Sequence, residues 1–190
     1  MSEQPVIKTE RLILRPFKLS DSPQVQHLAS DKEIASTTLT IPHPYESGVA
    51  EDWIGTHAQR FQEGKAAVFA LERQEDGRLL GAIGLEISPV HSRAEMGYWI
   101  GKPFWNRGYC TEAAAEMLRF GFEVLALNRI QARHFTRNPP SGKVMRKIGM
   151  THEAHLRESV KKWDRFEDLE LYAILKSDYE AKGERAGRTG

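Results

Sequence analysis

The sequence contains one cysteine, Cys110, among its 190 residues. A single thiol forms neither an intramolecular disulfide nor a thiolate zinc site, which excludes a disulfide-stapled scaffold and indicates a reducing compartment. The seven histidines show no ligand spacing such as His-Glu-x-x-His, so no metal site is expected. No segment approaches the ~20 consecutive apolar residues that span a bilayer. Because charged residues interrupt the N-terminal segment where a signal peptide needs an apolar stretch, we expect a soluble cytoplasmic protein without a membrane partner.

Net charge is nearly absent as well. Lys and Arg total 27 against 26 Asp and Glu, which gives a formal net charge of +1 at pH 7. This balance lacks the positive field that non-specific nucleic-acid binding requires, so no nucleic-acid partner is expected. With 40% hydrophobic and 28% charged residues, the composition is typical of a packed globular chain. We predict one domain over residues 6–178, followed by a polar C-terminal tail, 179–190, that is disordered.

The hydrophobic pattern predicts a mixed α/β (α+β) fold. Apolar runs predict strands at 11–16, 66–73, 79–90, 94–100, 129–135, 153–161 and 166–176. Three-to-four-residue periodicity predicts helices at 20–29, 46–63, 111–125 and 139–148. An Asp-Gly turn at 76–77 joins the second and third strands, so the strands within 66–100 form an antiparallel meander. Residues 37–45 form a loop long enough to line a pocket.

One loop, residues 105–111 (WNRGYCT), has the pattern of an anion-binding helix start. Unpaired amides at a helix N-terminus point outward together, and Gly108 lets a bulky anion approach the backbone closely. Arg107 adds a charge of matching sign. The alternative is that Gly108 only turns the chain and that Arg107 is solvated. The loop lacks both the Gly-Lys-Ser/Thr ending of a P-loop and the Gly-x-Gly-x-x-Gly of dinucleotide-binding folds.

A second motif follows the strand at 129–135. Asn138 is suited to cap the next helix and Pro139 to begin it, so Ser141 falls one turn on, on the same side as Asn138. Two neutral hydrogen-bonding side chains then converge at the carboxyl end of a strand, although the alternative is that both only cap the helix. Gly142 inside this helix costs about 1 kcal/mol relative to alanine, which indicates that a side chain is not accommodated there.

Together with segments 9–16 (TERLILRP), 95–100 (EMGYWI) and 168–175 (DLELYAIL), these motifs resemble the GNAT N-acetyltransferases, in family order along the chain. The sequence is most similar to the RimJ/RimL branch, the ribosomal-protein Nα-acetyltransferases, over residues 6–178. The resemblance implies a GNAT fold, a mixed and mostly antiparallel sheet of about seven strands flanked by about four helices. It also implies acetyl-CoA as co-substrate, a primary amine as acceptor and a homodimer as one expected assembly.

The resemblance also assigns residues to the cofactor and to the chemistry. The loop after Trp105 would cradle the pyrophosphate of acetyl-CoA, and a hydroxyl, Ser141, would protonate the leaving thiolate. The cofactor-binding set that the resemblance implies is Trp99, Ile100, Arg107, Gly108, Tyr109, Cys110, Thr111, Asn138 and Lys143. Trp105 itself departs from the Gln or Arg of the family pattern, which weakens side-chain help to the phosphates but leaves the backbone amides unchanged.

The acceptor must lose a proton, because most substrate amines are protonated at neutral pH and attack requires a free lone pair. A carboxylate, or water bound to one, is a suitable proton acceptor. Glu95, on a strand facing the expected cleft, and Glu158, on the penultimate strand, are the two candidates. For each, the alternative is a solvated charge or half of an ion pair. Cys110 has no neighbouring histidine base, so direct transfer is favoured over an acetyl-cysteine.

Two classes of function remain open from the sequence. The first is an acetyl-CoA-dependent N-acetyltransferase, whose acceptor is either a protein α-amine or a small-molecule amine such as an aminoglycoside or polyamine. The second is a non-catalytic acyl-CoA sensor or interaction module. Such a module would keep Arg107 and Gly108 but would have no use for Ser141, so the presence of Ser141 favours the enzyme.

Overall fold

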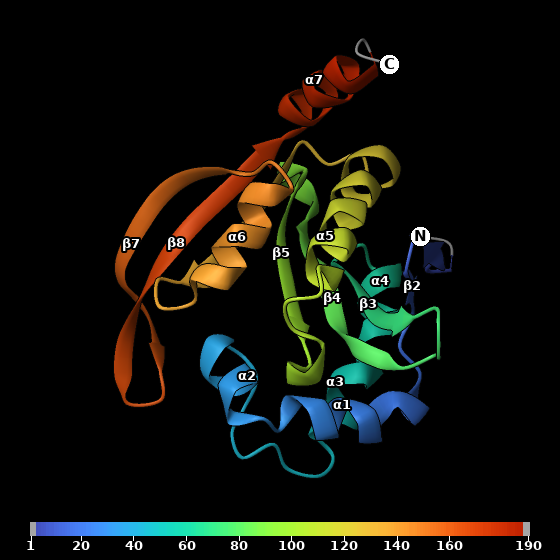
Figure 1. Cartoon of the computed structure of the whole chain (residues 1–190), viewed down its shortest axis with the longest axis vertical. Coiled ribbons are helices and arrows are strands. Elements are labelled where there is room, and N and C mark those ends of the chain that lie inside the picture. Colours follow the sequence, from blue (N-terminus) through green and yellow to red (C-terminus); the bar gives the residue numbers. More distant parts are fainter. Residues whose placement is uncertain (1–2, 188–190) are drawn as a thin grey trace.

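An eight-stranded sheet runs through the middle of the molecule (Figure 1). The computed structural model describes residues 3–187, with side chains described as far as Lys182. The sheet has the order β1-β2-β3-β4-β5-β6-β8-β7. Its strands are β1 (Ile7–Lys8), β2 (Leu12–Arg15), β3 (Ala66–Arg73), β4 (Leu79–Ser88), β5 (Arg93–Ile100), β6 (Arg129–Phe135), β7 (Thr151–Lys162) and β8 (Arg165–Leu175). The predicted mixed fold and its meander, β3-β4-β5, are confirmed, and β1 is added to the predicted strands.

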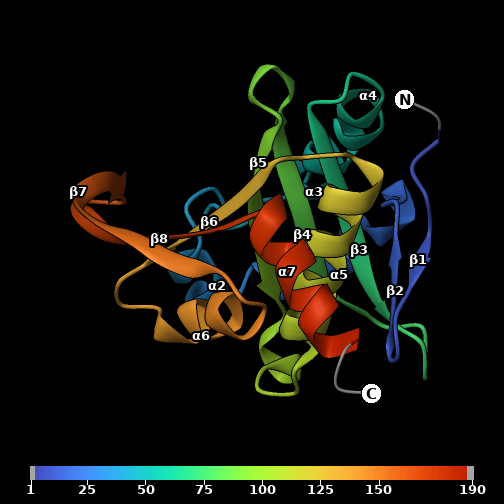
Figure 2. The same cartoon turned by 90° about the horizontal axis from the view of Figure 1, so that it is seen from above.

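Every neighbouring pair of strands is antiparallel except β5 and β6. These two parallel strands pair only at their beginnings, where residues 93–95 face residues 129–131. Beyond this point β5 continues beside β4, whereas β6 turns away together with β8 and β7. Figure 2 shows the split from above, with β6 leading away from β5. The sheet is therefore divided into two arms that are joined at one end.

Helices cover both faces of the sheet. They are α1 (Ser22–Ala29), α2 (Lys32–Thr37), α3 (Val49–Gly55), α4 (His57–Gln62), α5 (Tyr109–Arg119), α6 (Pro139–Lys147) and α7 (Lys176–Gly187). Helices α1 and α3 pack on the face of β3 that carries Ala70, whereas α5 packs on the face that carries Phe69. The rings of Phe69 and Phe120, both fully buried, meet edge to face at 5.5 Å, and each burial contributes about 1.5–3 kcal/mol. No helix of the described residues is long and apolar enough to cross a bilayer.

Two helices on the α1–α3 face differ from the prediction. The helix predicted at 46–63 is divided into α3 and α4, because the chain bends at Thr56, whose hydroxyl donates back to the carbonyl of Trp53 at 2.9 Å. Helix α2 forms where no helix is predicted. Its N-cap is Asp31, whose carboxylate accepts from the amide of Glu33 at 2.8 Å. The cap rather than any apolar periodicity specifies this short helix.

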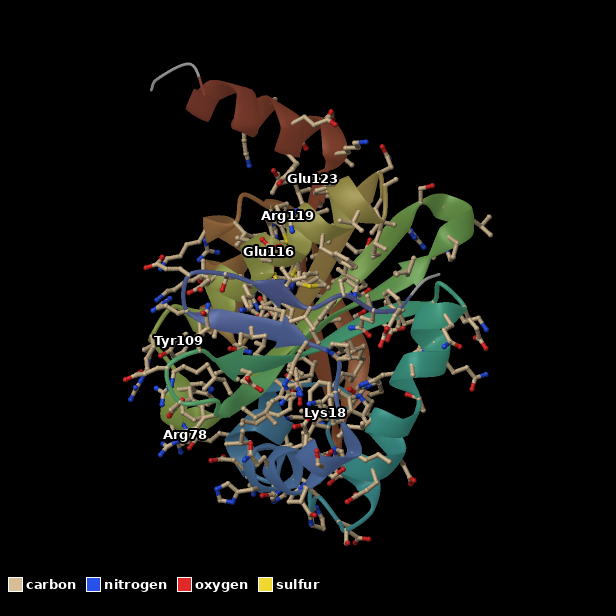
Figure 3. All side chains as sticks on the ribbon, turned by 90° about the vertical axis from the view of Figure 1, so that its right-hand side faces the viewer. Lys18, Arg78, Tyr109, Glu116, Arg119 and Glu123 are labelled. Atoms are coloured by element: carbon tan, nitrogen blue, oxygen red, sulfur yellow. The ribbon has the colours of Figure 1, made fainter. Side chains whose placement is uncertain are left out.

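The C-terminal segment differs from the expected disordered tail, since residues 179–187 belong to α7. The Tyr179 hydroxyl donates to Glu123 at 2.9 Å, and Lys182 donates to the carbonyl of Gly149 at 2.6 Å. Figure 3 shows Glu123 close to α7, at the end of a row that continues through Arg119 along α5. These two contacts anchor a helix whose sequence alone is too polar to predict. Residues 188–190 lie outside the described part of the chain.

Candidate active site

The split between β5 and β6 opens into a groove of about 1250 Å³ that reaches both faces of the sheet. Successive side chains of β5 point to opposite faces. Tyr98 points toward α6, where it contacts Ser141, and Trp99 points to the other face, where it packs near Trp53. All four of these residues line the groove. Two substrates that enter from opposite faces can therefore meet between the strands.

The edge of β5 that faces the groove has backbone groups free to bind an extended ligand. The amide of Gly101 donates to a β4 carbonyl at 2.7 Å, and the alternation of an antiparallel ladder then turns the Trp99 backbone toward β4 as well. The backbone groups of Tyr98 and Ile100 consequently face the groove. In agreement, the Ile100 carbonyl accepts from the indole of Trp105 at 2.6 Å. Of the predicted pair Trp99 and Ile100, only Ile100 presents its amide to a ligand.

The start of α5 has the geometry expected of an anion site. Gly108 occupies the N-cap with φ 80°, a left-handed conformation that favours glycine. The first hydrogen bond of α5 runs from the Glu112 amide to the Gly108 carbonyl at 3.1 Å, so the amides of residues 109–111 have no acceptor within the helix. Cys110 and Thr111 line the groove at this point. These free amides and the positive end of the helix dipole fit a diphosphate.

Cationic side chains surround this helix start. Arg107, Lys143 and Lys147 line the groove and are exposed, and none of them has an anionic partner within the described residues. The Cys110 thiol beside them is not a nucleophile, because burial raises its pKa to about 12. The predicted residues Arg107, Gly108, Cys110, Thr111 and Lys143 thus all line the same groove.

The turn between β1 and β2 holds the Arg107–Gly108 loop in place. Arg11 donates through Nε to Glu112 Oε2 at 2.7 Å and through Nη1 to the Arg107 carbonyl at 3.0 Å. The hydroxyl of Thr9 also donates to Glu112, at 2.6 Å. Burial by itself would raise the pKa of Glu112, but these hydrogen bonds keep the pKa below its usual value. The guanidinium of Arg11 covers the Tyr109 ring at 4.8 Å, and Tyr109, alone among the predicted residues of this loop, is absent from the groove lining.

Helix α6 brings Asn138 and Ser141 to the groove. They lie on the same side as residues 105–108, the loop before α5, which we call the α5 loop. Asn138 stands at the N-cap, but its side chain makes no capping hydrogen bond, so it stays available to a ligand. The hydroxyl of Ser141 lies 2.9 Å from that of Tyr98. Position 142 favours glycine, because a Cβ there would lie 2.5 Å from Nε2 of His134, which packs against α6. The sequence prediction that no side chain fits at position 142 is confirmed.

The face of the groove on the Trp99 side of β5 carries one of the two predicted carboxylates, and we call it the acceptor face. Glu95 lines the groove and accepts hydrogen bonds from Arg133 and Gln131. Glu158 lies at an irregularity of β7, is exposed and is absent from the groove lining, so the structure does not bring it to the site. Glu95 was predicted either as a base or as half of an ion pair, and the structure shows the ion pair.

Residues 36–41 are hydrogen-bonded to the arm of the sheet formed by β6, β8 and β7, and we call them the strap. Arg137, after β6, donates to the Ser36 carbonyl at 2.5 Å. Lys162, at the end of β7, donates to the carbonyls of Leu39 and Ile41 at 3.1 and 2.8 Å. Residues 37–41 line the groove, as the sequence predicts for the loop 37–45.

Three residues that sequence reasoning did not assign take part in the site. Arg11 supports the α5 loop, Tyr98 contacts Ser141 and Lys162 fixes the strap. Arg11 and Tyr98 stand within the segments that carry the family resemblance, which was the available signal. Lys162 gave no signal, because its partners are carbonyls more than a hundred positions away in sequence.

The fold and site define an acetyltransferase. Residues 11–151 match the family model described as the acetyltransferase (GNAT) domain, and the chain belongs to this family. A GNAT domain transfers acetyl from acetyl-CoA, and the free amides at α5 fit its pyrophosphate. N-acetyltransferase activity is accordingly the activity that the family supports for this chain.

Similar proteins agree with this assignment. The chain is 31% identical over 172 residues to a Bacillus licheniformis protein named "uncharacterized N-acetyltransferase p20", which covers 90% of this chain and 96% of that protein. It is 26% identical over 115 residues to the ribosomal-protein-serine acetyltransferase of Escherichia coli (strain K12). This alignment covers 60% of this chain and 63% of that protein. The solved structure of RimL, a ribosomal L7/L12 alpha-N-protein acetyltransferase in complex with coenzyme A, shares the fold, with a TM-score of 0.83 at 17% identity. The superposition covers 90% of this chain and 98% of the RimL chain.

Proposed function

We propose that this protein transfers the acetyl group of acetyl-CoA to a primary amine by direct attack within a ternary complex. The observation that carries the proposal is the groove, which brings the α5 helix start and Ser141 together with the strap and Glu95. Because the two sets of residues lie on opposite faces of β5, donor and acceptor approach each other along one line. Holding both reactants in this way contributes several kcal/mol, about 7–11 in the best-oriented cases.

Residues on the α5–α6 face would bind the donor. The amides of 109–111, with Arg107 and Lys143, are suited to the pyrophosphate. The free backbone edge at Ile100 is suited to the amide groups of the pantetheine arm, in the manner of an added strand. Asn138 supplies a further hydrogen bond near the same arm.

Acetyl transfer then needs a hydrogen-bond donor at the carbonyl oxygen of the thioester and a proton for the sulfur of the departing coenzyme A. The groove-facing amides of Tyr98 and Ile100 are the donors that the strand supplies. Ser141 would give its hydroxyl hydrogen to the sulfur as the carbon–sulfur bond breaks. Water in the groove would take the proton that the amine loses, because the hydrogen bonds from Arg133 already occupy Glu95.

The charge balance of the acceptor face favours an acceptor with a single ammonium group. The three carboxylates that line this face, Glu33, Glu86 and Glu95, each pair with a cation, namely Lys102, Arg60 and Arg133. The described residues therefore leave no uncompensated carboxylate there for a polyamine or aminoglycoside, whose several charges need one. We propose a protein α-amine or a monoamine with no further positive charge as the better acceptor.

The test measures coenzyme A release against a panel of peptides with free N-termini, monoamines, polyamines and aminoglycosides, with acetyl-CoA binding measured by calorimetry. Turnover with peptides or monoamines in preference to polyamines supports the proposal. Binding of acetyl-CoA without turnover of any amine would instead favour the acyl-CoA sensor. Failure to bind acetyl-CoA at millimolar concentration would overturn the assignment of the α5 loop.

A further inference from the structure

A partly buried hydrogen bond joins β5 to α6 beside the groove. The Tyr98 hydroxyl lies 2.9 Å from Ser141 Oγ and donates to the Ser141 carbonyl at 3.0 Å. No other partner for the Ser141 hydroxyl is found among residues 3–187. We propose that Tyr98 is a positioning residue, whose hydroxyl holds Ser141 Oγ in the orientation from which Ser141 donates to the leaving sulfur. This inference rests on the proposed acetyl transfer.

The hydrogens of the two hydroxyls can be distributed in two ways. When the Tyr98 hydrogen points to the Ser141 carbonyl, the serine hydrogen points to the Tyr98 oxygen. When the Tyr98 hydrogen points to Ser141 Oγ, the serine hydrogen is released toward the groove. Both acceptors lie at nearly the same distance from the phenol oxygen, so the exchange requires only rotation of two O–H bonds. Negative charge on sulfur favours the second arrangement, since hydrogen bonds to an ionised acceptor are about twice as strong.

The transfer step balances with Tyr98 unchanged. The amine lone pair forms the nitrogen–carbon bond, and the carbon–sulfur bond breaks with its electron pair passing to sulfur. Sulfur receives the hydrogen of Ser141, which recovers one from water, and the proton lost by nitrogen passes to water. Burial raises the pKa of the Tyr98 phenol far above its usual value, so Tyr98 keeps its proton throughout and can donate to Ser141 Oγ when negative charge develops on sulfur.

The Tyr98→Phe substitution separates this role from packing. The Tyr98 ring packs against the main core, and Tyr98→Phe keeps the ring while it removes the hydroxyl. Tyr172 offers a matched control, because its buried ring also carries a hydrogen-bonded hydroxyl, which accepts from Arg146 at 2.9 Å outside the groove lining. Tyr172→Phe therefore removes a comparable hydroxyl that does not touch Ser141.

The kinetic test is a double-mutant cycle with Tyr98→Phe and Ser141→Ala. We expect Tyr98→Phe to lower kcat about tenfold, the effect of one hydrogen bond, with the acetyl-CoA Kd within about twofold. We expect Ser141→Ala to lower kcat about 100-fold and the double variant to lose no more than Ser141→Ala alone. Tyr172→Phe should retain wild-type kcat. Equal tenfold losses from Tyr98→Phe in both backgrounds, or no loss in either, would overturn the proposal.

A titration without turnover separates this inference from the proposed function. The thiol of bound coenzyme A is titrated by thiolate absorbance below pH 10, where Cys110, with its pKa of about 12, stays protonated. A positioned Ser141 hydroxyl stabilises the thiolate, so Tyr98→Phe and Ser141→Ala should both raise the midpoint, Ser141→Ala by the larger amount, and Tyr172→Phe should not. An unchanged midpoint in Tyr98→Phe would overturn the role of Tyr98 even if acetyl transfer is found. Upward shifts in both variants without acetyl transfer would instead reject the proposed function alone.

Discussion

The guanidinium of Arg133 holds both carboxylate oxygens of Glu95, with Nε 2.9 Å from Oε1 and Nη2 2.8 Å from Oε2. Gln131 adds a third hydrogen bond, at 3.2 Å. These three bonds occupy most of the roughly four lone-pair sites of the carboxylate, and its charge is already paired with that of Arg133. Glu95 is therefore better suited to fix the join between β5 and β6 and to shape the acceptor face than to remove a proton.

Glu95→Gln keeps the size of the side chain and removes its charge. We expect kcat to fall less than tenfold, because a general base contributes about 10²–10⁴-fold and Glu95 does not act as one. Steady-state kinetics at saturating acetyl-CoA measures this. Glu158→Gln is the matched control and should behave as wild type, since Glu158 lies outside the groove. A loss above 100-fold in Glu95→Gln alone would identify Glu95 as the base.

Gly108→Val should weaken acetyl-CoA binding at least tenfold. Gly108 has φ 80°, and an added Cβ would meet the Arg11 guanidinium at 3.3 Å, so the loop must change its course. Calorimetry measures the Kd. Gly77→Val is the control, because Gly77 has φ 68° in a remote turn with nothing within 4 Å of an added Cβ. Equal Kd values for the two variants would argue against the phosphate site.

Arg11→Gln should also weaken acetyl-CoA binding, by about fivefold, because the Arg107 carbonyl and Glu112 lose the donor that fixes the loop. The exposed Arg78 provides the control, and Arg78→Gln should leave the Kd unchanged. An unaltered Kd in Arg11→Gln would mean that the loop keeps its shape without support from the turn between β1 and β2.

Gly142→Ala should destabilise the protein by about 1–3 kcal/mol, although alanine is the better helix former. The new methyl group would lie 2.5 Å from His134 Nε2, so α6 or the imidazole must move. Urea unfolding measures the change. Gly55→Ala, also in a helix but with nothing within 4 Å of its Cβ, should be neutral or stabilising. A Gly142→Ala variant as stable as wild type would show that α6 adjusts without cost.

His57 makes folding stability depend on pH. Its side chain is buried between Trp53 and Phe17, neither ring nitrogen has a partner, and burial lowers its pKa from 6.5 to about 4. Below pH 6.5 the unfolded chain binds a proton that the folded protein does not bind, so stability falls as the pH drops toward 4, by about 3 kcal/mol in all. Unfolding at a series of pH values measures this loss.

His57→Phe should remove this part of the pH dependence and be at least as stable as wild type at pH 7, since phenylalanine fills the site without unpaired nitrogens. A His57→Phe variant with the wild-type slope between pH 4 and 6.5 would place the titrating group elsewhere.

The sequence predicted the strands well because their apolar runs are long and their turns are marked. Helix α2 was missed because a single cap, Asp31, specifies it, and α7 was missed because its anchoring contacts at Tyr179 and Lys182 are with distant segments. The donor side of the site was predicted from local motifs around Gly108 and Ser141. On the acceptor side the sequence predicted Glu95 and the loop 37–45 but not their partners, because the pairing of Glu95 and the reach of Lys162 depend on how the two arms of the sheet diverge.

The short join between β5 and β6 has a consequence for dynamics. Main-chain pairing ties the two arms together only over residues 93–95 and 129–131. A pantetheine chain lying along the free edge of β5 would extend the ladder where the protein leaves it incomplete, and so act as a temporary strand. Amide hydrogen exchange along β5 and β6 should therefore slow when the donor is bound, and the loaded enzyme should melt at a higher temperature than the empty one.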